Sequence, residues 1–379
     1  MECIHPKYNM KSYWEKAYWF EKTDITIVGC GLVGLFTALF LKERRPHLKI
    51  QILERANMPQ GASTKNAGFA CFGTVGEIID DLGRSSKKQL IEIVKLRWEG
   101  LKLLKSIVPL ELMDYKEFGG MEVFDNKNSF ESCAASKDLI NAILFEATGL
   151  NKIIEVSSQA TFKGLYSKTL FNSKEGQLNP VKLVKYLVDK VVNLGVKVHF
   201  GCGVQAYEAS AQGCELLTTD NMHILTQKTI FTTNAFSKAF FPGIDLIPYR
   251  NQVLISKPIS KLKLNGCFHY HQGYIYFRNV ADRILIGGAR HLDMNKEQTL
   301  KFGHNEYLQT YLLDFIKKIS LLELTVDSKW SGIIATGESK MPICELLDNN
   351  VYAALRLGGM GVSTGAGVAR KISQLVLTT

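Results

Sequence analysis

The sequence has no C-x-x-C pair, although it contains eight cysteines in 379 residues. A disulfide framework is typical of short secreted chains, and a zinc site needs paired ligands, so this scattered pattern argues against both. We expect most of these cysteines to be free thiols, buried in a protein that resides in a reducing compartment.

Long apolar segments are also absent. Residues 1–16 contain polar residues throughout and lack the apolar core of a secretory signal, and no later stretch approaches the roughly 18 uninterrupted apolar residues of a membrane span. We therefore expect a cytoplasmic protein without a membrane span. The sequence has neither an internal repeat nor a low-complexity tract, so composition marks no clear linker between domains.

Two patterns that carry catalysis in other proteins are missing. No set of His, Cys, Asp and Glu residues has the spacing of metal ligands, and no serine stands in a nucleophile elbow with histidine and aspartate partners. We therefore predict neither a metal centre nor Ser-His-Asp chemistry.

The composition is that of an ordinary folded protein. At roughly 150 residues per domain the length predicts about two domains, and 46% hydrophobic with 22% charged residues is typical of a globular chain. The formal net charge of +10 raises the question of an acidic partner. Because the basic pieces at residues 42–45, 87–88 and 317–318 are short and lie on expected helices, we consider nucleic acid an unlikely partner.

The strongest local pattern is a strand, a glycine turn and a helix near the amino terminus. Residues 24–28 form a β-branched run, residues 32–43 have the pattern of a helix, and residues 48–53 form a second apolar run that ends at Glu54. These segments predict a right-handed βαβ unit and hence a parallel sheet.

The turn of this unit matches G-x-G-x-x-G at residues 29–34. In such a turn Gly29 makes the tight bend, Gly31 lets the backbone approach a pyrophosphate, and Gly34 lets the helix pack on the sheet. Glu54 follows Gly34 by 20 residues, the offset at which a carboxylate accepts hydrogen bonds from a ribose. The pattern predicts dinucleotide binding without deciding between FAD and NAD.

Several further elements are readable from periodicity and capping. Asn179 and Pro180 have the residue types of a helix start, and residues 282–283 interrupt an aromatic and β-branched alternation as a hairpin turn does. The expected segments are helices at 90–108, 137–147, 180–191 and 305–319, mainly strands at 196–256, and a hairpin at 270–286.

Two more loops indicate the family. Residues 61–68 form a small-residue and amide-rich loop, and residues 354–362 form a third glycine-rich loop before a helix. Together with Glu54 and Arg55, they resemble the D-amino acid oxidase superfamily of FAD-dependent oxidoreductases, which includes glycine, sarcosine and gamma-glutamylputrescine oxidases. Further matching pieces follow in the family's order, at residues 178–187, 196–204, 232–237, 248–256, 274–290 and 330–342.

The resemblance implies an α/β fold in which a Rossmann-like FAD-binding domain with a parallel sheet is interleaved with a substrate domain. The substrate domain has an α+β character and a large, mostly antiparallel sheet. The expected FAD-binding domain comprises residues 1–85, 148–235 and 326–379, and the expected substrate domain comprises residues 86–147 and 236–325.

The resemblance also assigns cofactor contacts. It places the turn glycines on the pyrophosphate, Glu54 on the adenosine ribose, the backbone of Val204 on adenine, and the loop around Met360 at the pyrimidine end of the flavin. We expect non-covalent FAD, because Ile333 stands about where sarcosine oxidase has its flavin-linking cysteine and residues 63–68 contain no histidine. The expected FAD-binding residues are Gly29, Gly31, Leu32, Val33, Gly34, Glu54, Arg55, Ser63, Thr64, Asn66, Ala67, Gly68, Val204, Gly358, Gly359, Met360, Gly361 and Val362.

The implied reaction is oxidation of a C–N bond by hydride transfer to flavin N5, followed by hydrolysis of the imine, with O2 or a quinone as electron acceptor. Amino acid oxidases of the family have a carboxylate-binding arginine where this chain has Ile334. We expect Arg356 to compensate, and consider Arg250, Arg278 and Arg290 as further candidates. The expected catalytic and substrate-binding residues are Arg356, Tyr276, Arg290 and Tyr249, with Tyr274 on the same sheet face as Tyr276. For His291, next to Arg290, we favour a surface histidine over a proton carrier.

Two other functions remain open at this point. A 2-hydroxy acid or polyol-phosphate dehydrogenase would share the fold and the cofactor. An RNA-associated flavoprotein would use the basic surplus to bind phosphates, although the sequence has no long basic block.

Overall fold

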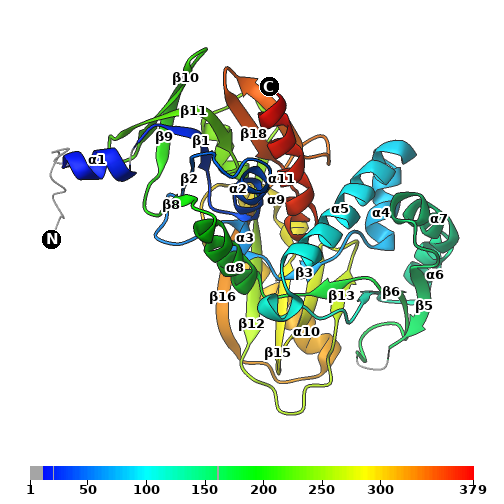
Figure 1. The fold of residues 1–379 in the computed structure, drawn as a ribbon. Helices are drawn as coiled ribbons and strands as arrows, with labels where there is room; N and C mark the ends of the chain where they lie inside the picture. Colours follow the sequence, from blue (N-terminus) through cyan, green and yellow to red (C-terminus); the bar gives the residue numbers. More distant parts are fainter. Residues whose placement is uncertain (1–11, 20, 160–161) are drawn as a thin grey trace.

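The computed structural model describes residues 12–19, 21–159 and 162–379, which form two eight-stranded sheets with helices packed around them (Figure 1). The first sheet has a parallel core, in which β1 pairs with both β11 and β2, β2 with β8, and β11 with β18. This arrangement confirms the expected Rossmann-like part. Its strands are β1 (Thr23–Val28), β2 (Ile50–Leu53), β8 (Lys197–His199), β9 (Val204–Ser210), β10 (Gly213–Thr218), β11 (His223–Phe231), β17 (Ile343–Asp348) and β18 (Val351–Leu355).

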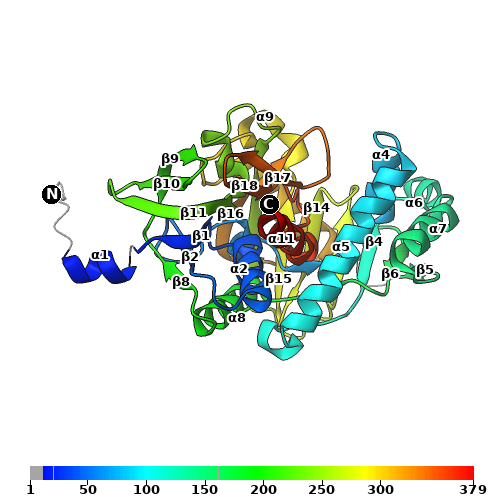
Figure 2. The same cartoon turned by 45° about the horizontal axis from the view of Figure 1, so that its top comes forward.

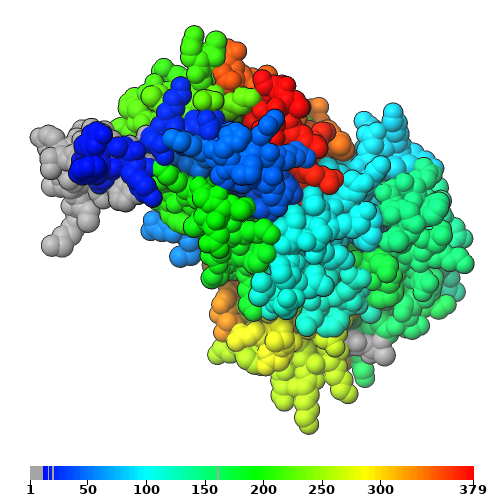
Figure 3. Space-filling view, in the orientation of Figure 1, coloured from blue at the N-terminus to red at the C-terminus, as the bar shows by residue number. Residues whose placement is uncertain are grey.

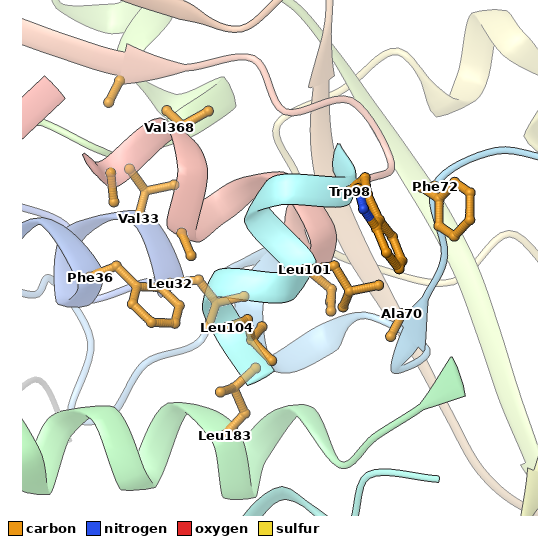
Figure 4. Close-up of a cluster of buried hydrophobic side chains, with 14 of the residues drawn as sticks. Leu32, Val33, Phe36, Ala70, Phe72, Trp98, Leu101, Leu104, Leu183 and Val368 are labelled. Atoms are coloured by element: carbon orange, nitrogen blue, oxygen red, sulfur yellow. The ribbon is translucent and has the colours of Figure 1, made fainter. Parts of the chain in front are cut away.

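Four helices pack together beside this sheet: α2 (Leu32–Arg44), α5 (Lys87–Ile107), α8 (Pro180–Asn193) and α11 (Gly361–Thr378). Every residue of α2 from Leu32 to Leu41 is buried, because α2 packs against the sheet, α8 and α11. Figure 4 shows side chains of all four helices meeting in one apolar cluster, with Phe36, Trp98 and Leu183 among them. From the outside these helices form a continuous surface (Figure 3).

The second sheet is antiparallel except where β13 runs parallel to β4. The expected hairpin is confirmed, since β14 and β15 pair around a turn in which Ala281 has a φ of +51°. Helix α10 (Glu306–Ser320) covers part of this sheet with an apolar face. The strands, in sheet order, are β16 (Val326–Thr336), β12 (Ile247–Ser256), β15 (Arg283–Gly288), β14 (Ile275–Val280), β13 (Cys267–Tyr270), β4 (Gly120–Val123), β6 (Lys168–Asn172) and β5 (Ile154–Ser158).

The remaining elements are short or peripheral. Helix α1 stands away from the body at one end of the molecule, and α4, α6 and α7 form the other end (Figure 2). None of the helices in the described ranges is long and apolar enough to cross a membrane. These elements are α1 (Tyr13–Trp19), α3 (Ala62–Lys65), β3 (Phe69–Ala70), α4 (Val75–Leu82), η1 (Leu110–Met113), α6 (Lys127–Ala134), α7 (Lys137–Thr148), β7 (Gly176–Gln177), η2 (Asn234–Ala239), η3 (Arg290–Leu292) and α9 (Met294–Glu297).

Sheet membership differs from the expected domain boundaries at three places. Strands β5 and β6, and also β16, belong to the second sheet although their residues were expected in the FAD-binding part. Helix α5, expected in the substrate part, packs both on α11, expected in the FAD-binding part, and on α7, expected in the substrate part. These boundaries are not readable from composition, because an amphipathic helix or an alternating strand has the same pattern whichever sheet it covers.

Candidate active site

A cavity of about 810 Å³ extends from the glycine turn after β1 to the face of the second sheet. It is lined by all of the expected FAD-binding residues except Gly34, Thr64 and Gly68, and by all four expected catalytic residues. Residues far apart in the sequence are therefore brought to one space between the two sheets.

The glycine turn has the shape that a pyrophosphate requires. Gly29 has a φ of +108°, and a Cβ on Gly34 would lie only 2.1 Å from the carbonyl oxygen of Gly29. A Cβ on Gly31 would lie 2.9 Å from Oγ of Ser63. Side chains at these positions would fill the space between β1, α2 and the loop of residues 61–68. The turn therefore fits the backbone-to-phosphate contacts of a dinucleotide.

Glu54 follows β2 and lines the cavity beside the glycine turn. Its Oε2 accepts a hydrogen bond from the N–H of Cys30 at 3.1 Å, and its Oε1 accepts one from the N–H of Ala56 at 3.1 Å. These bonds fix the carboxylate beside the glycine turn, where its free lone pairs suit ribose hydroxyls. Nearby, the Arg55 guanidinium stacks 3.7 Å from the ring centroid of Phe236, a residue that sequence reasoning did not assign to the site.

The conformation of the loop at residues 61–68 is fixed by hydrogen bonds of its own Asn66 side chain. Asn66 donates from Nδ2 to the carbonyls of Ala62 and Ser63, and its Oδ1 accepts from the N–H of Gly68. Gly68 has a φ of +74°, and a Cβ there would meet the carbonyl oxygen of Leu178 at 2.2 Å. Asn66 therefore shapes the loop as well as lining the cavity.

The glycine-rich loop at residues 354–362 leads into the amino terminus of α11. Gly358 has a φ of +59°, and both Gly361 and Val362 line the cavity at the first turn of the helix. The free N–H groups and positive dipole end of an 18-residue helix favour negative charge, as on the pyrimidine end of a reduced flavin. The thioether of Met360 packs 3.8 Å from Sγ of Cys71.

The structure distinguishes the four candidate arginines by their partners. Arg250 makes a two-point ion pair with Glu297, at 3.0 and 2.8 Å. Arg278 is buried and donates to the carbonyls of Ala67, Asn279 and Leu178. The guanidinium groups of these two arginines thus stabilise the fold.

Arg356 lines the cavity, yet its guanidinium is engaged by the protein. Nε and Nη2 both donate to the carbonyl of Met341, and Nη1 donates to the carbonyl of Asp245 and, at 2.5 Å, to its carboxylate. A fork of this kind leaves no pair of donors for a substrate carboxylate. We therefore no longer retain Arg356 as the carboxylate-binding residue.

Replacing Arg356 with methionine should destabilise the fold without weakening substrate binding. The change removes a nearly buried guanidinium that holds residue 341 against Asp245, and we expect the free energy of unfolding to fall by about 1–3 kcal/mol. Thermal unfolding and the KM of the purified variant measure the two effects. A KM that rises by more than tenfold at an unchanged melting temperature would contradict this assignment.

Arg290 is the candidate that remains open toward the cavity. Nη1 donates to Oδ1 of Asn251 at 3.2 Å, and the guanidinium lies 5.3 Å from the ring centroid of Tyr274. Within the described residues no carboxylate pairs with Arg290. A partly exposed, singly hydrogen-bonded guanidinium on a cavity wall can still receive an anionic group.

Tyrosines line the wall beside Arg290. Tyr249 lies opposite Ile334 in the β12–β16 pairing, and Tyr274 and Tyr276 both face the cavity, as expected from their alternation. Burial raises the pKa of Tyr276 to about 12, so its phenol stays neutral near neutral pH. His291 does not line the cavity; it contacts His271 at 3.1 Å, and burial lowers its pKa to about 4.

Sequence reasoning missed a polar group on this wall. Residues in register across the second sheet place Tyr276, His269 and Glu122 side by side on one face. Cys71 and Glu175 approach the same histidine from other segments. Nε2 of His269 and Oε2 of Glu175 are joined by a hydrogen bond, and burial raises the pKa of Cys71 well above its usual range, so a neutral thiol lies beside this pair. No motif spacing reveals the group, because its members come from separate strands and loops.

Comparison with known proteins gives a consistent result. The family described as DAO, FAD dependent oxidoreductase, matches residues 24–375. No match to a curated protein was found by sequence.

Similar solved structures share the fold over most of the chain. The glycine oxidase from Geobacillus kaustophilus has a TM-score of 0.78 at 15% identity, covering 94% of this chain and 95% of its own. The L-proline dehydrogenase from P. horikoshii has a TM-score of 0.74 at 15% identity, covering 94% of both chains. The L-alpha-glycerophosphate oxidase from Mycoplasma pneumoniae, solved with FAD bound, has a TM-score of 0.74 at 14% identity, covering 94% of this chain and 95% of its own.

Proposed function

Because the chain belongs to the DAO family of FAD-dependent oxidoreductases, we propose that it oxidises the C–N bond of an amine or amino acid that carries a carboxylate. The observation that carries this proposal is Arg290, a guanidinium that lines the cavity and has no carboxylate partner within the described ranges. Solved neighbours that include a glycine oxidase and a proline dehydrogenase support an amine substrate.

The chain provides a site that fits FAD. The glycine turn and the amino terminus of α2 would hold the pyrophosphate, Glu54 the ribose, and the amino terminus of α11 the flavin. When bound, FAD supplies the acceptor for the hydride that leaves the substrate carbon.

The protein then has to bind, orient and desolvate the substrate. Arg290, held by Asn251, would receive the carboxylate in a charge-assisted bond. The rings of Tyr249 and Tyr276 exclude water from the reacting carbon, and a neutral amine is favoured on such a partly apolar wall. The imine product hydrolyses in water and needs no nucleophile from the chain.

FAD should be released intact when the protein is denatured. Residues 63–68 have no histidine, and Ile333, near the family's position for a linking cysteine, is buried in the β12–β16 pairing opposite Arg250. After precipitation with acid, we expect the flavin absorbance in the supernatant and a colourless pellet. Flavin fluorescence that stays with the pellet in a denaturing gel would show covalent attachment instead.

Anaerobic bleaching of the flavin tests the proposed function. Amines, amino acids, 2-hydroxy acids and glycerol phosphates are mixed separately with the holoenzyme, and the loss of flavin absorbance is recorded. We expect bleaching by a carboxylated amine and reoxidation by O2 or a quinone. Bleaching by a hydroxy acid or polyol phosphate, but by no amine, would replace the proposal with the dehydrogenase alternative. A purified protein that binds no FAD would contradict both.

A further inference from the structure

His269 occupies a central position on the wall of the cavity. In register across the second sheet, Val253, Gly287, Tyr276 and His269 follow one another on neighbouring strands, so His269 shares a face with the residues that line the candidate substrate pocket. It lies in the cavity wall although only 6% of its surface is exposed. Its imidazole packs 5.4 Å from the ring of Phe69, which lines the same cavity.

A buried carboxylate orients this imidazole. Oε2 of Glu175 lies 2.8 Å from Nε2 of His269, and Glu175 is only 1% exposed. A carboxylate can only accept a hydrogen bond. In the neutral imidazole, Nε2 therefore carries the proton and Nδ1 has the free lone pair. No protein partner of Nδ1 is present in the part of the chain that the structure describes.

The carboxylates that line the cavity are already held by other groups. Glu54 accepts from two backbone N–H groups. Glu77 pairs with Arg97 at 3.1 Å and with Lys340 at 3.6 Å, and Asp80 pairs with Arg84 at 3.0 Å. Among the described titratable groups of the wall, His269 is therefore the one with a free basic lone pair and a carboxylate behind it.

We propose that His269, oriented by Glu175, accepts the proton that a substrate ammonium group must lose before its C–N bond is oxidised. The proton moves from the ammonium nitrogen to Nδ1 of His269, leaving a neutral amine and an imidazolium that Glu175 stabilises. This inference rests on the proposed function. In it His269 is a catalytic residue, and Glu175 is a positioning residue.

The carboxylates around His269 favour the protonated form of its imidazole. Burial lowers the pKa of His269, but the charge and hydrogen bond of Glu175, together with the charges of Glu122 and Glu77, outweigh burial and raise the pKa above its usual value. Glu122 on β4, Glu77 on α4, Tyr276 on β14 and the thiol of Cys71 also face this histidine, and the two carboxylates act in the same direction as Glu175.

Glu122 extends the proton path behind the wall. Both of its oxygens accept from the N–H of Gly76, at 3.1 and 3.0 Å, and burial raises its pKa to about 7. A void of about 10 Å³ is lined by Glu122, Glu175, His269 and Asn172, among others. This volume is that of about one water probe, and the lining offers the polar partners that a buried water needs.

The test uses the holoenzyme and the variants His269→Gln and Glu175→Gln. The rate of anaerobic flavin reduction by an amine is measured as a function of pH. The wild-type rate should rise with pH as His269 loses its proton. Glu175→Gln removes the stabilising charge and should move this rise to lower pH by about 1 unit or more. His269→Gln should abolish the rise and lower the second-order rate constant about 100-fold or more.

A second readout does not depend on turnover. The imidazole Cε1–H signal of His269, assigned by its loss in His269→Gln, is followed by NMR during a pH titration of histidine-labelled holoenzyme. We expect its midpoint to lie above that of an exposed histidine in the wild type and to fall in Glu175→Gln. His223→Gln is the matched control, because His223 forms an exposed pair with Glu215 at 2.5 Å, on the β10–β11 hairpin.

The outcomes separate the two proposals. If no amine bleaches the wild-type flavin, the proposed function fails whatever His269 does. If an amine bleaches it and both variants keep the wild-type pH dependence and rate, the role of His269 is overturned while the function stands. A stoichiometric tightly bound metal that is lost in Cys71→Ser would likewise overturn it. If His269→Gln does not fold, the pH dependence of flavin reduction in the wild type and in Glu175→Gln still decides: the same pH midpoint in both would overturn the role of His269.

Discussion

Replacement of Arg290 with methionine is expected to lower kcat/KM for a carboxylated amine about 100-fold, which corresponds to about 3 kcal/mol for a lost charge-assisted contact. The structure provides the reason, because Arg290 is the candidate arginine whose guanidinium is not engaged by protein carboxylates or backbone carbonyls in the described residues; it donates only to the side chain of Asn251. Most of the loss should appear in KM, since the carboxylate is bound equally before and during the reaction.

Two comparisons make this prediction specific. Arg283→Met removes the same charge from the other end of β15, where Arg283 pairs with Asp327 at 3.1 Å, and should leave kcat/KM nearly unchanged. The decarboxylated analogue of the substrate should react equally with the wild type and with Arg290→Met. If the variant is impaired with both compounds alike, Arg290 does not bind the carboxylate.

The second large effect is expected at Gly34. In Gly34→Ala the new Cβ would meet the backbone oxygen of Gly29 at 2.1 Å and Oγ1 of Thr232 at 2.8 Å, so α2 and the turn must move apart. We expect purified Gly34→Ala to contain little FAD and to lose about 1–3 kcal/mol of folding free energy. Flavin-to-protein absorbance and thermal unfolding measure the two consequences.

A matched glycine controls for the added methyl group. Gly365 lies buried in α11, and a Cβ there would meet Cβ of Leu32 at 3.5 Å, an ordinary contact. Gly365→Ala should keep its FAD and its stability, because alanine also favours the helix. Wild-type FAD content in Gly34→Ala would show that the turn tolerates a side chain and would remove the geometric argument for the cofactor site.

Local patterns predicted the cofactor site because its signals lie within short segments. The glycine turn, the helix α2 and Glu54 form one continuous βαβ unit, and Asn179 does cap α8 by accepting from Val181 and Lys182. In these cases the residues that determine the geometry are neighbours in the sequence.

The substrate side was less predictable because partners decide it. Arg356 and Arg290 are both arginines next to a strand end, and only the positions of Asp245 and Met341 show that the first guanidinium is engaged. His269 on β13 and Glu175, in the turn between β6 and β7, are far apart in the sequence and meet through the fold. A side chain's partners across a sheet follow from topology, which a single sequence does not specify.

The order in which the chain builds its two sheets has a further consequence. The chain starts in the first sheet, crosses to the second for β4 to β6, returns for β8 to β11, crosses again for β12 to β16, and ends in the first with β17 and β18. The second sheet, whose face lines the candidate substrate pocket, is therefore not one contiguous piece of the sequence. Exchange of this sheet between related chains by recombination would therefore need two separate segments, residues 120–172 and 247–336.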